Sequence, residues 1–289
     1  MPLHGFGTRS AVNDKSNLPS FFVIGPPRTG TSWLHMVLSE CAWLSHPTKE
    51  TRFFDKYFEC GLSWYRSHYR KVADGRVIGE VAPTYFASPE ARQRIARLIP
   101  QAKIVCTFRN PVDRIVSLYR LKRAYGLIPW AFDDALRHDP ELVESSLYAT
   151  HLTDWLKTFG DSQVMVTMYE GLQADPQSYL DRLLDFVGIP RMKLGPSHML
   201  RVFTAEGMTE PRNYFLTRGA VLLADWSKKQ RIGSIVHAAK RLGATRLFIG
   251  GGPSFPEVPS SQRTKLRELF RGEVDKLEAM LNRDLSAWK

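Results

Sequence analysis

Cysteine is scarce in this chain of 289 residues, which has only Cys41, Cys60 and Cys106. An odd number of cysteines without metal-ligand spacing excludes a disulfide scaffold and a zinc finger. It predicts reduced thiols and a cytoplasmic protein. The chain is also long enough to bury a full core without disulfides or metals.

Long apolar runs are missing as well. No stretch reaches the roughly 20 apolar residues that a membrane helix needs, and the N-terminus lacks the apolar segment of a signal peptide. Residues 1–18 are instead rich in small and polar residues. We expect a flexible arm at 1–18, a single domain over 19–289, and no membrane span.

Acidic residues are outnumbered, because 40 Lys and Arg against 29 Asp and Glu give a net charge of +11. Such a surplus favours an anionic partner, for example a nucleotide or an anionic glycan. The cations are dispersed, without a Lys/Arg block or a nucleic-acid-binding motif. We therefore expect no nucleic-acid partner.

Short β-rich runs alternate with amphipathic patterns, which predicts an α/β fold with a mostly parallel sheet flanked by helices. The expected strands are residues 21–25, 103–108 and 163–168. The expected helices cover about 31–41 and 88–99, begin near 110 and 176, and end with one at about 261–282. In the last helix, a stripe that includes Leu266, Leu269 and Phe270 is expected to pack in the core.

The most informative stretch is GPPRTGTSW, which follows the first expected strand and opens a helix. A Gly-rich turn at a helix N-terminus offers unpaired backbone N–H groups and the positive end of the helix dipole, which together hold a phosphate. The spacing is that of a P-loop, but Thr31 stands in place of the usual lysine and Arg28 lies within the loop. The loop suits one terminal phosphate better than a triphosphate.

A second candidate anion site is TFRNPVDRIVSLYR, in which Arg109 ends a strand and Ser117 lies on the following helix. A guanidinium fork and a hydroxyl group that converge there suit a phosphate monoester. Arg114, in the same stretch, is expected to be structural or surface-exposed.

Together these motifs resemble the sulfotransferases that use 3′-phosphoadenosine 5′-phosphosulfate, and among them the heparan sulfate N- and 3-O-sulfotransferase branch. The resemblance implies the sulfotransferase fold, the product 3′-phosphoadenosine 5′-phosphate, and no metal. It implies that Arg109 and Ser117 bind the 3′-phosphate and that the loop holds the 5′-phosphate. The loop residues are Pro27, Arg28, Thr29, Gly30, Thr31 and Ser32.

Arg28 departs from the family, which usually has lysine at this position. A guanidinium keeps the positive charge but is effectively never deprotonated. We therefore expect Arg28 to take part in catalysis by stabilising the departing phosphate electrostatically.

The resemblance also names a general base. KETRFF resembles the K-E-x-x-F-F stretch of the heparan sulfate branch, whose glutamate is the catalytic base, and Glu50 occupies that position. Phe53 and Phe54 are expected to help exclude water. His46, nearby, is a reserve candidate for the base.

Glu80 is the other reserve candidate. It lies in GEVAPTYF, which resembles the branch's E-K-x-P-x-Y-F segment. The lysine of that segment helps to hold sulfate and substrate in the family, but this chain has Val81 instead. Either that lysine is dispensable here or another cation, such as Lys49, replaces it.

A further departure lies near the C-terminus, where the branch usually has a K-G-R loop that clamps the cofactor and this chain has IGGGPSFP. Arg246, or backbone N–H groups at Gly251 and Gly252, are expected to substitute. The stretch between Gly195 and Gly252 is expected to shape the acceptor pocket.

The favoured hypothesis is a sulfotransferase that acts on a hydroxyl or amine of a carbohydrate, lipid or small metabolite, inside a bacterial cell. One alternative is a P-loop kinase with a degenerate loop, which would depend on magnesium. The other alternative is a non-catalytic protein that binds nucleotides or anionic polymers, with salt-sensitive binding and no turnover.

Overall fold

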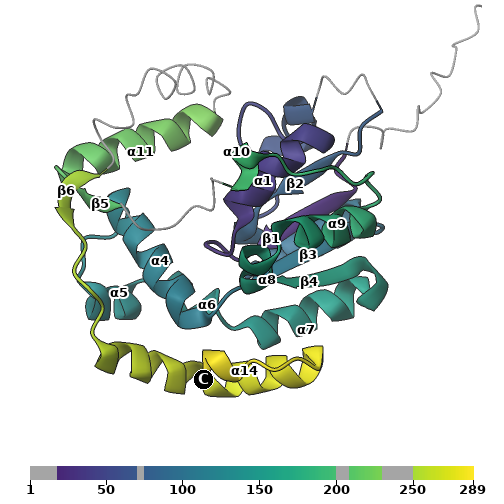
Figure 1. The fold of residues 1–289 in the computed structure, drawn as a ribbon. Coiled ribbons are helices and arrows are strands. Elements are labelled where there is room, and N and C mark those ends of the chain that lie inside the picture. Colours follow the sequence, from purple (N-terminus) through teal and green to yellow (C-terminus); the bar gives the residue numbers. More distant parts are fainter. Residues whose placement is uncertain (1–17, 70–74, 200–207, 230–249) are drawn as a thin grey trace, which may run out of the picture.

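The computed structural model describes residues 18–69, 75–199, 208–229 and 250–289 (Figure 1). Almost all of the predicted N-terminal arm, and Arg246, therefore lie outside the described residues. Leu18, the last residue of that expected arm, packs against the hydrophobic core instead.

Four parallel strands form the main sheet, in the order β2-β1-β3-β4. They are β1 Phe21–Gly25, β2 Gly79–Val81, β3 Lys103–Phe108 and β4 Val164–Met168. The sequence predicts all of them except the short edge strand β2. Because the strands run in one direction, the loops that follow β1 and β3 meet at the same edge of the sheet.

Helices cover both faces of this sheet, as Figure 1 shows. The helices α1 Thr31–Cys41 and α9 Pro176–Val187 pack on one face. On the other face lie α3 Pro89–Leu98, α4 Pro111–Ala124 and α7 Tyr148–Phe159. This arrangement confirms the predicted α/β architecture.

The remaining elements lie around this core. The C-terminal helix α14 Ser260–Leu281 packs along α7 and α4, and β5 Thr209–Pro211 pairs antiparallel with β6 Gly251–Ser254. The other helices are α2 Gly61–Arg66, α5 Phe132–His138, α6 Glu141–Glu144, α8 Tyr169–Ala174, α10 Pro196–Met199 and α11 Tyr214–Lys229. Within the described ranges, none of the helices has the length and apolar character needed to cross a membrane.

Capping side chains explain why most predicted helix boundaries agree with the structure. The Asn110 side chain accepts hydrogen bonds from the backbone N–H groups of Val112 and Asp113 at the start of α4. Ser88 and Asp175 cap α3 and α9 in the same way. These bonds satisfy donors that a helix leaves unpaired at its first turn.

One expectation about buried side chains was wrong. For Arg114, the structure decides between the two alternatives, structural or surface-exposed. Leu269, expected in the core, is 58% exposed, while Leu266 and Phe270 are buried. Because α14 contacts the protein along only one side, its buried stripe is narrower than the apolar pattern suggests. Arg114 is structural rather than exposed, since it is fully buried and donates to Ser146 Oγ and the Leu142 carbonyl.

Candidate active site

Gly25 and Gly30 shape the loop after β1, because a side chain at either position would be strained. Gly25 has a φ of +76°, and a Cβ there would lie 2.6 Å from Cβ of Pro83. Gly30 has a φ of +94°, and its Cβ would lie 3.0 Å from the Leu172 side chain. The loop thus turns tightly and leads directly into α1, whose first N–H groups have no partner within the helix.

Buried contacts hold this loop closed. Thr29 is fully buried, and its hydroxyl group donates to the Pro26 carbonyl at 2.7 Å and meets Thr107 Oγ1 on β3. The Thr29 hydroxyl group thus makes two contacts that tie the loop to itself and to β3. Arg28 has a φ of +76°, which is costly for a residue other than glycine. The surrounding contacts offset that strain.

The two predicted anion sites form a single pocket. Arg28 Nε donates a hydrogen bond to Ser117 Oγ at 2.8 Å, although the two residues come from different motifs. Arg109 lines the same pocket, and its charge, after burial, helps to lower the pKa of Arg28. Among the described residues, neither guanidinium forms an ion pair with a carboxylate. Two cations held together in this way favour an anion between them.

Two further residues line this pocket that the phosphate motifs do not contain. Tyr169 and Leu172 lie there together with Gly30, Thr31, Ser32 and Trp33 of the loop motif. The Tyr169 ring lies under Arg109, with 4.7 Å between Cζ and the ring centroid. The position of MYEGL directly after β4 is the local signal for Tyr169 and Leu172, because the ends of parallel strands share one edge of the sheet.

Glu50 is connected to this pocket through Lys49 and Ser32. Its side chain is 27% exposed, and its Oε1 is 3.4 Å from Lys49 Nζ. Lys49 Nζ in turn donates to Ser32 Oγ at 2.9 Å, which connects Glu50 to the phosphate loop. Tyr125, at the end of α4, feels both charges: burial raises its pKa, Arg28 lowers it and Glu50 raises it. Glu50 and Arg28 are thus both close enough to Tyr125 to act on its charge.

Phe53 and Phe54, which are expected to help exclude water, follow Glu50 in the sequence and face the protein core. Both rings are buried in the core, where Phe53 stacks on Tyr65 at 4.5 Å between ring centroids and Phe54 packs against Phe22. Their apolar side chains belong to the cluster under the sheet. They anchor the chain that follows Glu50 to the core.

Glu80 is fully buried, and burial raises its pKa to about 7. Its Oε1 accepts from the Thr51 backbone and hydroxyl group and from the Tyr85 hydroxyl, and its Oε2 accepts from the Tyr65 hydroxyl. Both oxygens are therefore occupied by donors of the core. This geometry suits a residue that positions Thr51, next to Glu50, better than a base that contacts an acceptor.

The other reserve positions receive no support from the geometry. His46 is exposed and does not line the pocket; its backbone N–H donates to the His68 carbonyl at 3.0 Å. Gly251 donates its N–H to Thr209 Oγ1 at 2.7 Å, within the β5–β6 pair. Neither Gly251 nor Gly252 lines the pocket of the phosphate loop.

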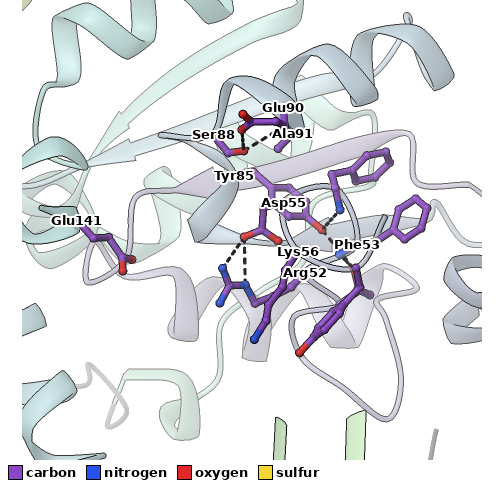
Figure 2. Close-up of polar contacts among 12 residues, drawn as sticks. Arg52, Phe53, Asp55, Lys56, Tyr85, Ser88, Glu90, Ala91 and Glu141 are labelled. Atoms are coloured by element: carbon purple, nitrogen blue, oxygen red, sulfur yellow. Dashed lines mark hydrogen bonds and ion pairs between the residues drawn. The ribbon is translucent and has the colours of Figure 1, made fainter. Parts of the chain in front are cut away.

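The two cations that soon follow Glu50 in the sequence, Arg52 and Lys56, are paired with carboxylates of the chain. Figure 2 shows Arg52 forked onto Asp55, with hydrogen bonds of 3.0 and 2.7 Å. Lys56 pairs with Asp225 of α11, which also accepts from the Tyr57 hydroxyl at 2.6 Å. These bonds attach α11 to the segment that carries Glu50.

The sequence matches a family model described as a sulfotransferase domain over residues 18–208. It is 30% identical to human heparan sulfate glucosamine 3-O-sulfotransferase 6, over 89% of this chain and 70% of that protein. It is 28% identical to human heparan sulfate glucosamine 3-O-sulfotransferase 3A1, over 92% of this chain and 62% of that protein. The mouse bifunctional heparan sulfate N-deacetylase/N-sulfotransferase 4 is 27% identical over 94% of this chain, which spans 31% of its length.

Among solved structures, a sulfotransferase from Alicyclobacillus acidocaldarius superposes with a TM-score of 0.68 at 22% identity. The match covers 94% of this chain and 98% of that structure. At this identity the likeness concerns the fold. These comparisons confirm both the resemblance inferred from the motifs and the predicted fold.

Proposed function

The chain belongs to the sulfotransferase family, and from this premise we propose that it transfers a sulfuryl group from 3′-phosphoadenosine 5′-phosphosulfate to a hydroxyl or amine of an acceptor. The relatives named above are sulfotransferases of heparan sulfate. The proposal for this chain rests on the residues of its own pocket.

The observation that carries the proposal is the pairing of Arg28 and Arg109 in one pocket at the N-terminus of α1. A nucleotide with separate 3′- and 5′-phosphates fits this arrangement, because each guanidinium comes from a different loop. Ser117 accepts a hydrogen bond from Arg28, so its own O–H stays available to donate to one phosphate. The backbone N–H groups of α1 can hold the other.

Glu50 is proposed as the general base. It is connected to the pocket through Lys49 and Ser32, and its side chain is partly exposed, so an acceptor can reach it. A carboxylate there can take the proton of the attacking hydroxyl or amine while the cations of the loop stabilise the charge that forms on the phosphate. The donor supplies the sulfuryl group, and no metal is needed in this scheme.

Carbohydrates are the first acceptors to test, followed by lipids and small metabolites. The net charge of +11 and the resemblance to the heparan sulfate branch favour an anionic carbohydrate. Arg52 and Lys56 are already paired with carboxylates of the chain and are therefore less available to bind an anionic acceptor. Smaller and less charged acceptors are tested for this reason. The cytoplasmic location and bacterial origin stay predictions.

Calorimetric titration with 3′-phosphoadenosine 5′-phosphate, without metal, tests the proposal against ATP with magnesium. We expect the bisphosphate to bind, and Arg109→Ala to weaken it about 10- to 100-fold through loss of a charged contact. Arg137→Ala is the control for a loss of positive charge, because its side chain is 71% exposed and far from the pocket motifs in sequence.

Three other outcomes have distinct meanings. Preference for magnesium-ATP would contradict the proposal and support the kinase alternative. Salt-sensitive binding without any turnover would support the non-catalytic alternative. Equal losses in Arg109→Ala and Arg137→Ala would show that overall charge, and not the pocket, governs binding.

A further inference from the structure

Lys49 occupies an unusual position between the phosphate loop and the proposed base. Its Nζ donates to Ser32 Oγ at 2.9 Å and lies 3.4 Å from Glu50 Oε1. Ser32 belongs to the first turn of α1 and lines the pocket. A single ammonium group therefore contacts both the phosphate loop, which is the proposed donor side, and Glu50, which is on the proposed acceptor side.

In an in-line transfer the sulfur atom must lie between two oxygens. One is the bridging oxygen on the phosphate, held by the loop, and the other is the acceptor oxygen, next to the base. Because Lys49 contacts a residue at each end of this line, its ammonium group lies beside the path of the sulfuryl group. We propose that Lys49 is a catalytic residue that binds the sulfuryl oxygens during transfer, an inference that rests on the proposed function.

The other cations are less well placed for this role. Arg28 is turned toward Ser117 and Arg109, which places it on the phosphate side. Position 81 supplies no charge, because it is a valine. Val81 is also fully buried, in the apolar cluster between the sheet and α1. The lysine on the opposite side of Glu50 in sequence, Lys56, pairs with Asp225.

Of the cations near Glu50, Arg52 is held by Asp55, whereas Lys49 forms the ion pair with Glu50. Burial and then the Lys49 charge lower the pKa of His35 to about 4, so His35 is neutral near pH 7 and adds no further cation. A lysine ammonium is compact and has three donors, so it can keep Ser32 or Glu50 while it binds a sulfuryl oxygen.

Lys49 is neither bonded covalently nor deprotonated during the transfer. A bond forms between the acceptor oxygen and sulfur while the bond between sulfur and the bridging oxygen breaks. The bonding electron pair leaves with the phosphate, and the acceptor proton passes to Glu50. Lys49 keeps its proton throughout and stabilises the negative charge that the sulfuryl oxygens carry in the transition state.

The test compares the binding of two nucleotides that differ only in the sulfuryl group. In Lys49→Met, the affinity for 3′-phosphoadenosine 5′-phosphate should stay within about twofold of the unmodified protein, and that for the phosphosulfate should fall about 10-fold or more. Formation of the bisphosphate from the phosphosulfate should slow about 100-fold. Lys56→Met is the matched control, and Lys49→Arg should recover the sulfuryl-dependent affinity in part because it keeps the charge.

Each result separates this inference from the proposed function. Equal weakening of both nucleotides in Lys49→Met would overturn the inference and leave Lys49 as a support of the loop. Unchanged binding and turnover would also overturn it. Failure of the unmodified protein to bind either nucleotide would instead contradict the proposed function itself.

Discussion

The phosphate loop, the proposed donor side, and the segment around α11, which is expected to shape the acceptor pocket, are built differently. On the donor side, the loop after β1 is locked by buried bonds such as that of Thr29 to the Pro26 carbonyl, and Arg28 reaches Ser117 across two motifs. On the other side, α11 presents large apolar side chains to solvent, with Phe215 81% and Leu223 64% exposed. Its neighbours β5 and β6 form only a short antiparallel pair.

This difference follows from what each region must do. A phosphate cradle needs fixed N–H groups and cations, so its backbone and packing are tightly specified. A surface that recognises an acceptor can change side chains without disturbing the fold. The pairing of Lys56 with Asp225 attaches α11 to the segment that follows Glu50.

The largest expected effect of a single substitution is on the base. Glu50→Gln removes the proton acceptor but keeps the shape of the side chain, so turnover should fall about 100- to 10,000-fold. Binding of 3′-phosphoadenosine 5′-phosphate should be unchanged, because Glu50 contacts the donor side only through Lys49. Turnover is measured with the acceptor found in the screen. A variant that kept its activity would contradict the assignment of Glu50 and favour Glu80 or His46 instead.

The tight turn of the loop predicts the next largest effect, on stability. Gly25→Ala combines a φ of +76° with a Cβ 2.6 Å from Pro83, and we expect the free energy of unfolding in urea to fall by about 3 kcal/mol or more. Gly188→Ala is the control, because it has nearly the same φ, +79°, but open space around the Cβ. Its cost should be about 1 kcal/mol. Equal losses would show that the contact with Pro83 is unimportant.

Much of the donor side could be predicted from the sequence because its signals are local. Strand, glycine turn and helix follow one another within GPPRTGTSW, and Asn110 caps the helix that carries Ser117. What could not be predicted depends on contacts between distant residues. The bond from Lys49 to Ser32 and the burial of Phe53 are examples. The K-E-x-x-F-F motif says which residues are present, but not which of them face the core.

The pH dependence of stability should show a smaller effect, which reports on Glu80. Burial raises the pKa of Glu80 to about 7 in the folded protein, above the ordinary value of 4.5. Between these two values the folded state holds a proton that the unfolded state has lost, so stability falls as pH rises through this window. The slope is at most about 1.4 kcal/mol per pH unit. Glu80→Gln should remove this slope, measured as unfolding free energies from pH 4.5 to 8.

The same substitution distinguishes the two glutamates. Glu80→Gln replaces the carboxyl group that accepts hydrogen bonds from Thr51, Tyr65 and Tyr85 with an amide, which has one acceptor oxygen instead of two. It should therefore disturb the position of Glu50 rather than abolish proton transfer. Loss of turnover should be smaller in Glu80→Gln than in Glu50→Gln. A larger loss would favour Glu80 as the base.

The smallest expected effect comes from the exposed face of α11. Leu223→Ser removes an apolar side chain that is 64% exposed, so the free energy of unfolding should change by no more than about 0.5 kcal/mol. Binding of 3′-phosphoadenosine 5′-phosphate should not change, because α11 contributes no residue to the donor pocket. By contrast, Leu180→Ser, on α9, should cost several times more because Leu180 is fully buried in the core. If Leu223→Ser proved as costly as Leu180→Ser, the apolar face of α11 would be part of the folded core, and the two sides of the protein would be built alike.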